Sequence, residues 1–208
     1  MARAKAARKG NGERSPEDRL IDAALELAGR QGWRRTGLAE IAAEAGLKLH
    51  EAYAIHRSKA AILGAFTRRI DREVLTGAGA AEDGETTRDR LFDTLMRRYD
   101  ALKPYKPALR AILRDSVGDP LALCGVARLG RSITWMLEAA GIPTAGLRGH
   151  ALVHLTGALY LSVLRVFLGD DSEDLARTMA ALDRGLRRGE SLLRFAPRRR
   201  REDMASPA

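Results

Sequence analysis

The stretch from Thr36 to Lys59 reads TGLAEIAAEAGLKLHEAYAIHRSK and carries the spacing of two short helices. The first helix is expected from about Leu38 to Ala45, and the second from about Lys48 to His56. Gly46 lies between them and supplies the backbone freedom that a tight turn needs. Two short helices joined in this way form a helix-turn-helix, whose second helix can enter a DNA major groove about 12 Å wide.

Small apolar residues of this stretch are spaced to pack the two helices together. The predicted contacts come from Ile41, Ala42, Ala45, Leu47, Ala52 and Ile55. Because these residues occupy one side of each helix, the outer side of the second helix is left free for a partner.

Helix signals continue on both sides of the motif. Ser15 followed by Pro16 and two acids is typical of a helix start, and Gly29 and Gly32 weaken and end that helix. Ser58 can cap a fourth helix with an apolar face. Residues 77–84 indicate a loop, so we expect a three-helix helix-turn-helix head, with the linking fourth helix, at residues 15–78.

The remainder, residues 86–195, predicts an all-α body. Its first helix begins near Thr86 or Thr87, and prolines at 104 and 107 interrupt the chain before a short helix that runs to about residue 115. Asp119 and Pro120 are expected to cap a helix over 121–140, which the segment 141–143 ends. No alternating strand pattern is present in the sequence.

Two long helices are expected to complete the body. Thr144 would cap a helix over about 145–168 that is apolar on nearly every side and should therefore be buried on more than one side. Ser172, with two acids after it, would open the last helix, which carries Leu175 on its apolar face. In a homodimer these helices of both chains would form a four-helix seam.

The chain of 208 residues has a formal charge of +9, of which two basic tails at 1–14 and 196–208 hold +6. These tails are expected to be disordered, and they attract any polyanion, DNA or anionic lipid alike. Cys124 is the single cysteine, which excludes an internal disulfide and fits a reducing cytoplasm. No signal peptide and no membrane-spanning helix is expected, so a cytoplasmic location is predicted.

Catalytic signals are lacking in the sequence. We find no glycine-rich phosphate loop and no nucleophile motif, so we expect no enzyme activity and no cofactor. His150 and His154 share one face of an apolar helix, but no other Cys or His cluster accompanies them. They are best interpreted as buried, hydrogen-bonded histidines, with ligand contact as the next option and no metal site.

The helix-turn-helix resembles the N-terminal domain of TetR-family repressors over about residues 16–75. The matched positions are Gly32, Thr36, Ile41, Ala42, Ala45, Gly46, Tyr53, Ser58 and Lys59. The resemblance implies a TetR-like all-α fold and a ligand-responsive DNA-binding regulator that acts as a homodimer, with repression as the expected role and activation left open. It also implies phosphate contacts for Thr36, Tyr53 and Lys59, the last at a helix N-terminus that favours anions.

This chain departs from the family pattern where the second motif helix begins. Lys48, Leu49, His50 and Glu51 stand where the family has Ser, any residue, Gly and Thr. Lys48 can still bind phosphate, whereas His50 is bulkier than Gly and Glu51 should repel phosphate unless it reaches a cytosine amino group. The candidate DNA-binding residues are Thr36, Lys48, Leu49, His50, Tyr53, Arg57 and Lys59. The alternative is a helix-turn-helix kept only as a packing unit.

The segment from Leu168 to Arg184 resembles a second group, the TetR-like accessory proteins of ubiquinone biosynthesis. That resemblance implies a lipid-binding accessory protein that no longer binds DNA. Leu192, Leu193 and Phe195 beside four arginines could touch an anionic membrane surface, or could belong to a solubilising tail.

The body is expected to hold an unknown small apolar ligand, with a lipid as one option. Residues spaced as core residues, together with the two histidines, are the candidates for its pocket. They are Tyr99, Tyr105, Trp135, Met136, His150, His154 and Tyr160.

Overall fold

The computed structural model describes residues 14–77, 85–116 and 122–195, and in these residues it contains helices and no strand. The helices are α2 (Pro16–Gln31), α3 (Leu38–Glu44), α4 (Leu49–Ile55), α5 (Lys59–Thr76), α6 (Thr87–Leu102), the 3₁₀ turn η1 (Lys103–Tyr105), α7 (Lys106–Asp115), α8 (Ala122–Ala139), α9 (Gly146–Leu168) and α10 (Ala176–Phe195). The all-α prediction is confirmed. The chain separates into two compact units, one ending at Gly157 and the other beginning at Ala158.

Several sequence predictions fall outside the described residues. These are the two basic tails up to residue 13 and from residue 196, the loop over 78–84 and the cap at Asp119 and Pro120. The side chains of Cys124, Leu192, Leu193 and Phe195 are not described either.

The N-terminal helix α2 starts and ends where local chemistry predicts. The Ser15 hydroxyl accepts the Asp18 backbone N–H at 3.1 Å, Pro16 occupies the first turn, and Gly32 ends the helix with φ +93°. Leu20, Ile21 and their neighbours on the same face are buried. The helix continues through Gly29, so only Gly32 ends it.

The predicted helix-turn-helix is present as α3 and α4. Gly46 adopts φ +68°, the Gly46 N–H donates to Ala43 and the Leu47 N–H donates to Ala42, which is the hydrogen-bond pattern of a Schellman cap. Ile41, Ala42, Ala45 and Ala52 are buried, while Leu47 and Ile55 are half-buried. The Arg19 guanidinium of α2 donates to the Ala45 carbonyl at 3.1 Å, which ties the turn to the first helix.

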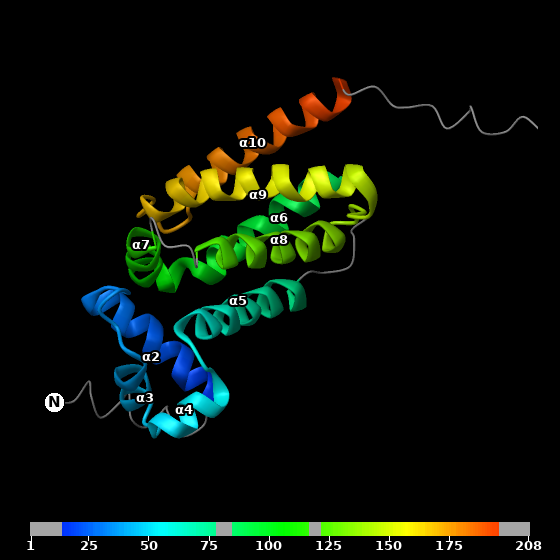
Figure 1. Cartoon of the computed structure of the whole chain (residues 1–208). Helices are drawn as coiled ribbons and strands as arrows, with labels where there is room; N and C mark the ends of the chain where they lie inside the picture. Colours follow the sequence, from blue (N-terminus) through cyan, green and yellow to red (C-terminus); the bar gives the residue numbers. More distant parts are fainter. Residues whose placement is uncertain (1–13, 78–84, 117–121, 196–208) are drawn as a thin grey trace, which may run out of the picture. The chain divides into compact units, whose positions relative to one another are not determined.

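Helix α5 leads from the motif into the body within the first unit. Figure 1 shows α2, α3 and α4 grouped together, with α5 running from this group beside α6 and α8. Its N-cap is Ser58, as predicted, and the hydroxyl accepts the Ala61 N–H at 3.1 Å. Farther along α5, Asp71 accepts hydrogen bonds from Arg98 of α6 and from the Ser132 hydroxyl of α8. One carboxylate therefore joins three helices.

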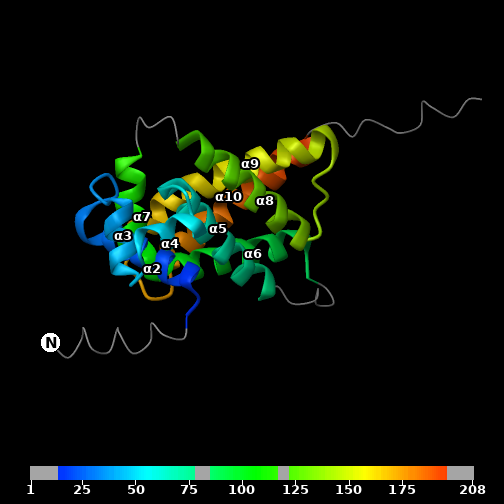
Figure 2. The ribbon, with the colours of Figure 1, turned by 60° about the horizontal axis from the view of Figure 1, so that its bottom comes forward.

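Helix α7 provides the second connection between the motif and the body. It lies beside α2 in both Figure 1 and Figure 2. Its last residue, Asp115, accepts the Arg34 backbone N–H at 3.0 Å, and hydrogen bonds from Arg34 and Arg114 lower its pKa. A Cβ on Gly32 would lie 3.2 Å from the Asp115 carboxylate, so both φ and space favour glycine there.

Body helix boundaries largely follow the prediction. Thr86 caps α6 by accepting the Asp89 N–H at 3.2 Å, and the prolines at 104 and 107 coincide with η1 and the first turn of α7. The predicted cap at Thr144 is wrong, because its hydroxyl and its N–H both donate to Glu138 and α9 begins only at Gly146.

The turn between α9 and α10, in the second unit, is built on Asp170. This side chain is buried and accepts hydrogen bonds from the N–H and hydroxyl groups of Ser172 and Thr178, at 2.5 to 3.3 Å. Burial raises the pKa of Asp170, but these hydrogen bonds outweigh it and hold the pKa well below its usual range. Leu175 is fully buried with φ 54° just before the helix, so α10 starts four residues later than predicted.

Helix α9 is not buried all round in the single chain. Leu147 is 91% exposed and Leu155 is 59% exposed, whereas Tyr160, Val163 and Phe167 are buried. By length and composition, α9 is apolar enough to cross a membrane, and it is the one such helix in the described part of the chain. Length and composition alone make this a weak indication, because helices of soluble cores pass the same test.

Candidate nucleic-acid interface

Five of the seven predicted DNA-binding residues lie on the exposed side of α4 and its two ends. Leu49 and Tyr53 are 55% and 59% exposed, and Lys48, His50 and Arg57 are also exposed. Lys48 precedes the helix, and Leu49 and Tyr53 stand four residues apart, on one face. The Arg57 guanidinium lies 5.9 Å from the centre of the Tyr53 ring, close enough for a cation–π contact.

The three acids of the motif make local contacts. Glu51 accepts the Lys48 backbone N–H at 2.7 Å, and Glu40 accepts the Gly37 N–H at 2.8 Å, so each carboxylate caps its own helix. Glu44 lies 3.7 Å from Arg30 of α2. The capping contact explains why a carboxylate is tolerated at position 51, where the family pattern has Thr.

Three basic side chains in the motif or next to it form no ion pair with any described residue. Among the described residues, Arg35, Lys48 and Arg57 are exposed, and no carboxylate forms an ion pair with them. The sequence interpretation did not select Arg35. Its place in the polar loop before α3, beside a matched Thr, is the signal that could have found it.

Thr36 and Lys59 are turned toward the protein interior. Thr36 is 2% exposed and its hydroxyl donates to the Gly32 carbonyl at 2.8 Å. The Lys59 ammonium donates to the carbonyls of Trp33 and Thr36, at 2.6 and 2.8 Å, and lies 4.5 Å from the centre of the Trp33 ring. Burial lowers the pKa of Lys59, opposed by the charges of Asp115 and Glu40. Both residues hold the loop between α2 and α3, a placement that does not favour the phosphate contacts implied by the resemblance.

An apolar hollow of about 670 Å³ lies beside α4. Its lining combines apolar residues of α2, α3, α4 and α5 with two histidines: Leu20, Leu38, Ala39, Leu49, His50, Ala52, Tyr53, His56 and Ile62. Leu38 and Ala39 were not selected from the sequence, and both are exposed on α3. Apolar side chains at such a surface can contact the methyl group of thymine.

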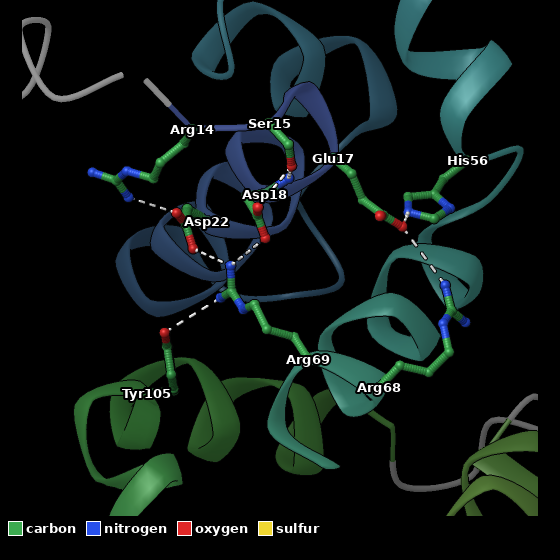
Figure 3. A network of polar contacts seen from close by, with 9 residues as sticks. All are labelled: Arg14, Ser15, Glu17, Asp18, Asp22, His56, Arg68, Arg69 and Tyr105. Carbon is green, nitrogen blue, oxygen red and sulfur yellow. Dashed lines mark hydrogen bonds and ion pairs between the residues drawn. The ribbon is translucent and has the colours of Figure 1, made fainter. Parts of the chain in front are cut away.

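A polar network connects α2, α5 and η1 (Figure 3). Arg69 lies 2.8 Å from Asp22 and 3.5 Å from Asp18, and it donates to the Tyr105 hydroxyl at 3.3 Å. Burial lowers the pKa of Arg69, but Asp22 and its other partners outweigh this and raise it. These contacts join α2 to η1 of the body through Arg69 of α5.

A second, separate set of polar contacts lies at the end of α4. His56, which follows α4 and is nearly buried, lies 3.0 Å from Glu17, and Arg68 of α5 lies 3.6 Å from the same carboxylate. A carboxylate of α2 and a guanidinium of α5 therefore meet beside the residue that follows α4.

The predicted ligand residues are scattered rather than gathered in one cavity. Tyr99, Met136 and Tyr160 are buried, as core spacing predicts, and Tyr105 packs edge-on against Phe66 with ring centres 5.0 Å apart. Core spacing was wrong for Trp135, which is 59% exposed.

The interpretation of His150 and His154 as buried is also wrong. Both are exposed on α9, and a ring nitrogen of His150 lies 2.9 Å from the Gly146 carbonyl. Within the described residues, no three His, Cys, Asp or Glu side chains are grouped as metal ligands.

A family model and several solved structures are similar to this chain. Residues 20–66 match the family model described as bacterial regulatory proteins, tetR family. The solved TetR transcriptional regulator from Nitrosomonas europaea is 25% identical, with a TM-score of 0.69 over 84% of this chain and 98% of that chain. A TetR transcriptional regulator from Rhodococcus sp. RHA1 is 24% identical, with a TM-score of 0.57 over 84% and 96%.

A third structure was solved with a bound ligand. Thermus thermophilus FadR, a TetR-family transcriptional repressor in complex with lauroyl-CoA, is 20% identical, with a TM-score of 0.55 over 92% of this chain and 99% of that chain. At this identity the likeness concerns the fold. A comparison with curated proteins gives no match.

The family match covers the helix-turn-helix itself, and the structural likeness extends over most of the chain. The exposed side of α4 and the turn at Gly46 have the geometry that this domain requires. Residues 20–66 are therefore similar to the helix-turn-helix domain of the tetR family of bacterial regulatory proteins, and the fold of the described chain is similar to that of TetR transcriptional regulators.

Proposed function

We propose that this protein is a cytoplasmic, ligand-responsive repressor that binds operator DNA as a homodimer, without catalytic activity. The observation that carries the proposal is the exposed side of α4, where unpaired cations flank an apolar and aromatic surface. Lys48, Arg57 and Arg35 would hold phosphates, and phosphate contacts set the register of a protein on DNA. Leu49, His50 and Tyr53 would face the base edges or the sugars.

The homodimer is supported by the exposed stripe of α9. Leu147, Ala151, Leu155 and Ala158 are all exposed and fall on one helical face. An apolar stripe of this kind is covered by a second copy in a four-helix seam, together with α10. In such a dimer the two α4 helices would read half-sites about 34 Å apart.

Ligand response is proposed for the body. A small apolar ligand would bind by repacking Tyr99 or Met136 in the core of the first unit, with Tyr105 at the junction with α5. The DNA-binding domains of the dimer would have two arrangements, of which one fits the operator. A ligand that binds the other arrangement more tightly shifts the population toward it and so lowers the affinity for the operator. That Thermus thermophilus FadR was solved with lauroyl-CoA supports an acyl compound as the first ligand to test.

The test is DNA binding by the intact protein at stated salt concentrations. Duplexes from the region flanking its own gene are titrated in fluorescence anisotropy against a scrambled duplex. Lys48→Ala is expected to weaken binding to all duplexes and to reduce the salt slope by about one. Arg110→Ala, which removes one exposed charge from α7, serves as the control with unchanged binding. Binding that does not prefer any flanking duplex, with and without lauroyl-CoA, would overturn the proposal.

A lipid-binding accessory protein without DNA binding is the second candidate. It is favoured by the apolar hollow beside α4 and by His50 and Glu51, which replace the small residues of the family pattern. Organic extraction of the purified protein followed by mass spectrometry tests it. A stoichiometric lipid together with no operator preference would support this candidate, and a lipid-free protein with operator preference would exclude it.

A further inference from the structure

A second hollow, of about 560 Å³, lies between α5 and α8 within the first unit. Four arginines line it, Arg68 and Arg72 from α5 and Arg128 and Arg131 from α8, together with Asp71, Ser132 and Trp135. The two α5 arginines stand four residues apart, and the α8 residues 128, 131 and 135 recur at helical spacing. Two basic helix faces that are distant in sequence thus meet at one concave surface.

The charge of this hollow is not neutralised by its own aspartate. Asp71 already accepts hydrogen bonds from Arg98 and from the Ser132 hydroxyl, the latter at 2.7 Å. Within the described part of the chain, Arg72, Arg128 and Arg131 have no carboxylate partner, and Arg68 has only an exposed contact of 3.6 Å with Glu17. A concave cluster of guanidinium groups attracts an anion, because guanidinium binds carboxylate and phosphate through paired N–H donors.

Gly64 of α5 shapes the cluster. A Cβ at this position would lie 3.4 Å from the Nε atom of Arg128, so the missing side chain lets Arg128 lie against α5. Arg128 is thereby half-buried and held at the wall of the hollow rather than extended into water. Part of its conformational entropy is lost before any ligand arrives, which favours binding.

Trp135 adds a flat apolar surface to the same hollow. It is 59% exposed, an unusual state for the largest side chain, and it is on the arginine-bearing face of α8. An indole ring at this position can stack on a planar ring of a ligand, while neighbouring guanidinium groups bind its charge.

We propose that the hollow between α5 and α8 binds a small phosphorylated molecule with a planar ring, of the nucleoside diphosphate class. The phosphates bridge Arg72, Arg128 and Arg131, and the ring stacks on Trp135. The volume falls within the range of small-molecule sites, which is roughly 300–1,000 Å³. This ligand class differs from the apolar ligand proposed for the core of the body.

Arg68 connects this site to the DNA-binding motif. It lines the hollow and also contacts Glu17, the carboxylate that holds His56 at the end of α4 (Figure 3). A phosphate in the hollow competes with Glu17 for Arg68 and so changes the support of α4. This consequence, unlike binding itself, rests on the proposed DNA-binding function.

The experiment measures binding of ADP, inorganic pyrophosphate and adenosine to the full chain without DNA. Isothermal titration calorimetry gives the affinities, and fluorescence reports on Trp135, with buried Trp33 present in every sample as the unperturbed emitter. ADP is expected to bind about tenfold more tightly than either pyrophosphate or adenosine, and to quench the emission of Trp135. The quenching should be absent in Trp135→Leu.

The variant Arg128→Gln/Arg131→Gln is expected to weaken ADP binding about tenfold or more, with the thermal unfolding midpoint used to confirm folding. Arg184→Gln, which removes a charge from the exposed surface of α10, is the control with unchanged affinity. Equal ADP affinity in the wild-type protein, the double variant and Arg184→Gln would overturn the proposal. An ADP affinity no higher than the affinity for pyrophosphate would also overturn it. Because no DNA is present, this failure would leave the regulator proposal standing.

Discussion

At the scale of single residues, the motif combines a familiar frame with unusual side chains on its outer surface. Glu51 is the clearest case, since its carboxylate caps α4 through the Lys48 N–H while its charge remains beside the expected DNA backbone. The capping contact contributes to helix stability, whereas the charge opposes phosphate binding. A carboxylate at this position thus stabilises the helix but weakens DNA binding.

Glu51→Gln should separate these two effects. Glutamine can still accept the Lys48 N–H, and removal of one exposed charge is expected to tighten DNA binding about fivefold, corresponding to about 1 kcal/mol. Anisotropy titrations at two salt concentrations measure the change, and Glu40→Gln, the equivalent cap of α3, is the control. Weaker binding confined to duplexes with one particular cytosine would show instead that Glu51 reads a base.

At the scale of elements, turns decide where the helices stop. Gly46 and Asp170 do this by different physics, one through a left-handed backbone and the other through a buried carboxylate that gathers four donors. Both turns set the angle at which one helix follows another, and both can be tested with single substitutions.

Gly46→Ala is expected to lower the free energy of unfolding by about 1–2 kcal/mol, because an L-residue at φ +68° is strained. Urea denaturation followed by circular dichroism measures this. Gly130→Ala is the matched comparison, since it lies within α8 with open space around it and should stabilise the helix by about 0.5–1 kcal/mol. A destabilisation of the same size in both variants would contradict the role assigned to the turn.

Asp170→Asn should reduce stability in a pH-dependent way. The folded-state pKa of Asp170 lies below its unfolded value, so the stabilisation is present above the unfolded pKa, about 3.9, and is lost as the pH falls toward the folded pKa. We expect a loss of about 2 kcal/mol at pH 7 that shrinks below about pH 4. Urea unfolding at pH 7, 5 and 3.5 tests this, with Asp171→Asn as the exposed control. A loss of constant size at all three pH values would be inconsistent with this role.

At the scale of the whole molecule, the apolar stripe of α9 is the feature that a single chain leaves unexplained. Leu147 and Leu155 expose much of their side chains to water, although α9 is the most apolar of the long helices. Covering such residues removes apolar surface from water at about 25 cal/mol per Å². A second copy of the chain is the proposed cover.

Leu155→Glu is expected to raise the dissociation constant of the dimer at least about tenfold, because the seam would bury a charge. Sedimentation velocity across a concentration series measures the oligomeric state. Leu113→Glu, which changes an exposed leucine of α7 in the same way, should leave the dissociation constant of the dimer unchanged. A wild-type protein that is monomeric at all concentrations would exclude the dimer.

Local signals in the sequence determined most of the helical frame. The caps at Ser15, Ser58 and Thr86 and the turn at Gly46 were predictable, because capping and φ preferences depend on residues only a few positions apart. The exposed residues of α4 could likewise be inferred from helical periodicity. Thr144 and Ser172 were misassigned because a polar residue near a helix start does not reveal which carboxylate will bind it.

Tertiary packing alone decided which polar side chains face inward and which distant surfaces meet. Thr36 and Lys59 turn toward the loop after α2 because buried carbonyl groups there need donors. The arginines of α5 and α8 are about sixty residues apart in the sequence and share one hollow only because these helices pack together. Helical periodicity reports which residues share a face, but not which helix that face will contact.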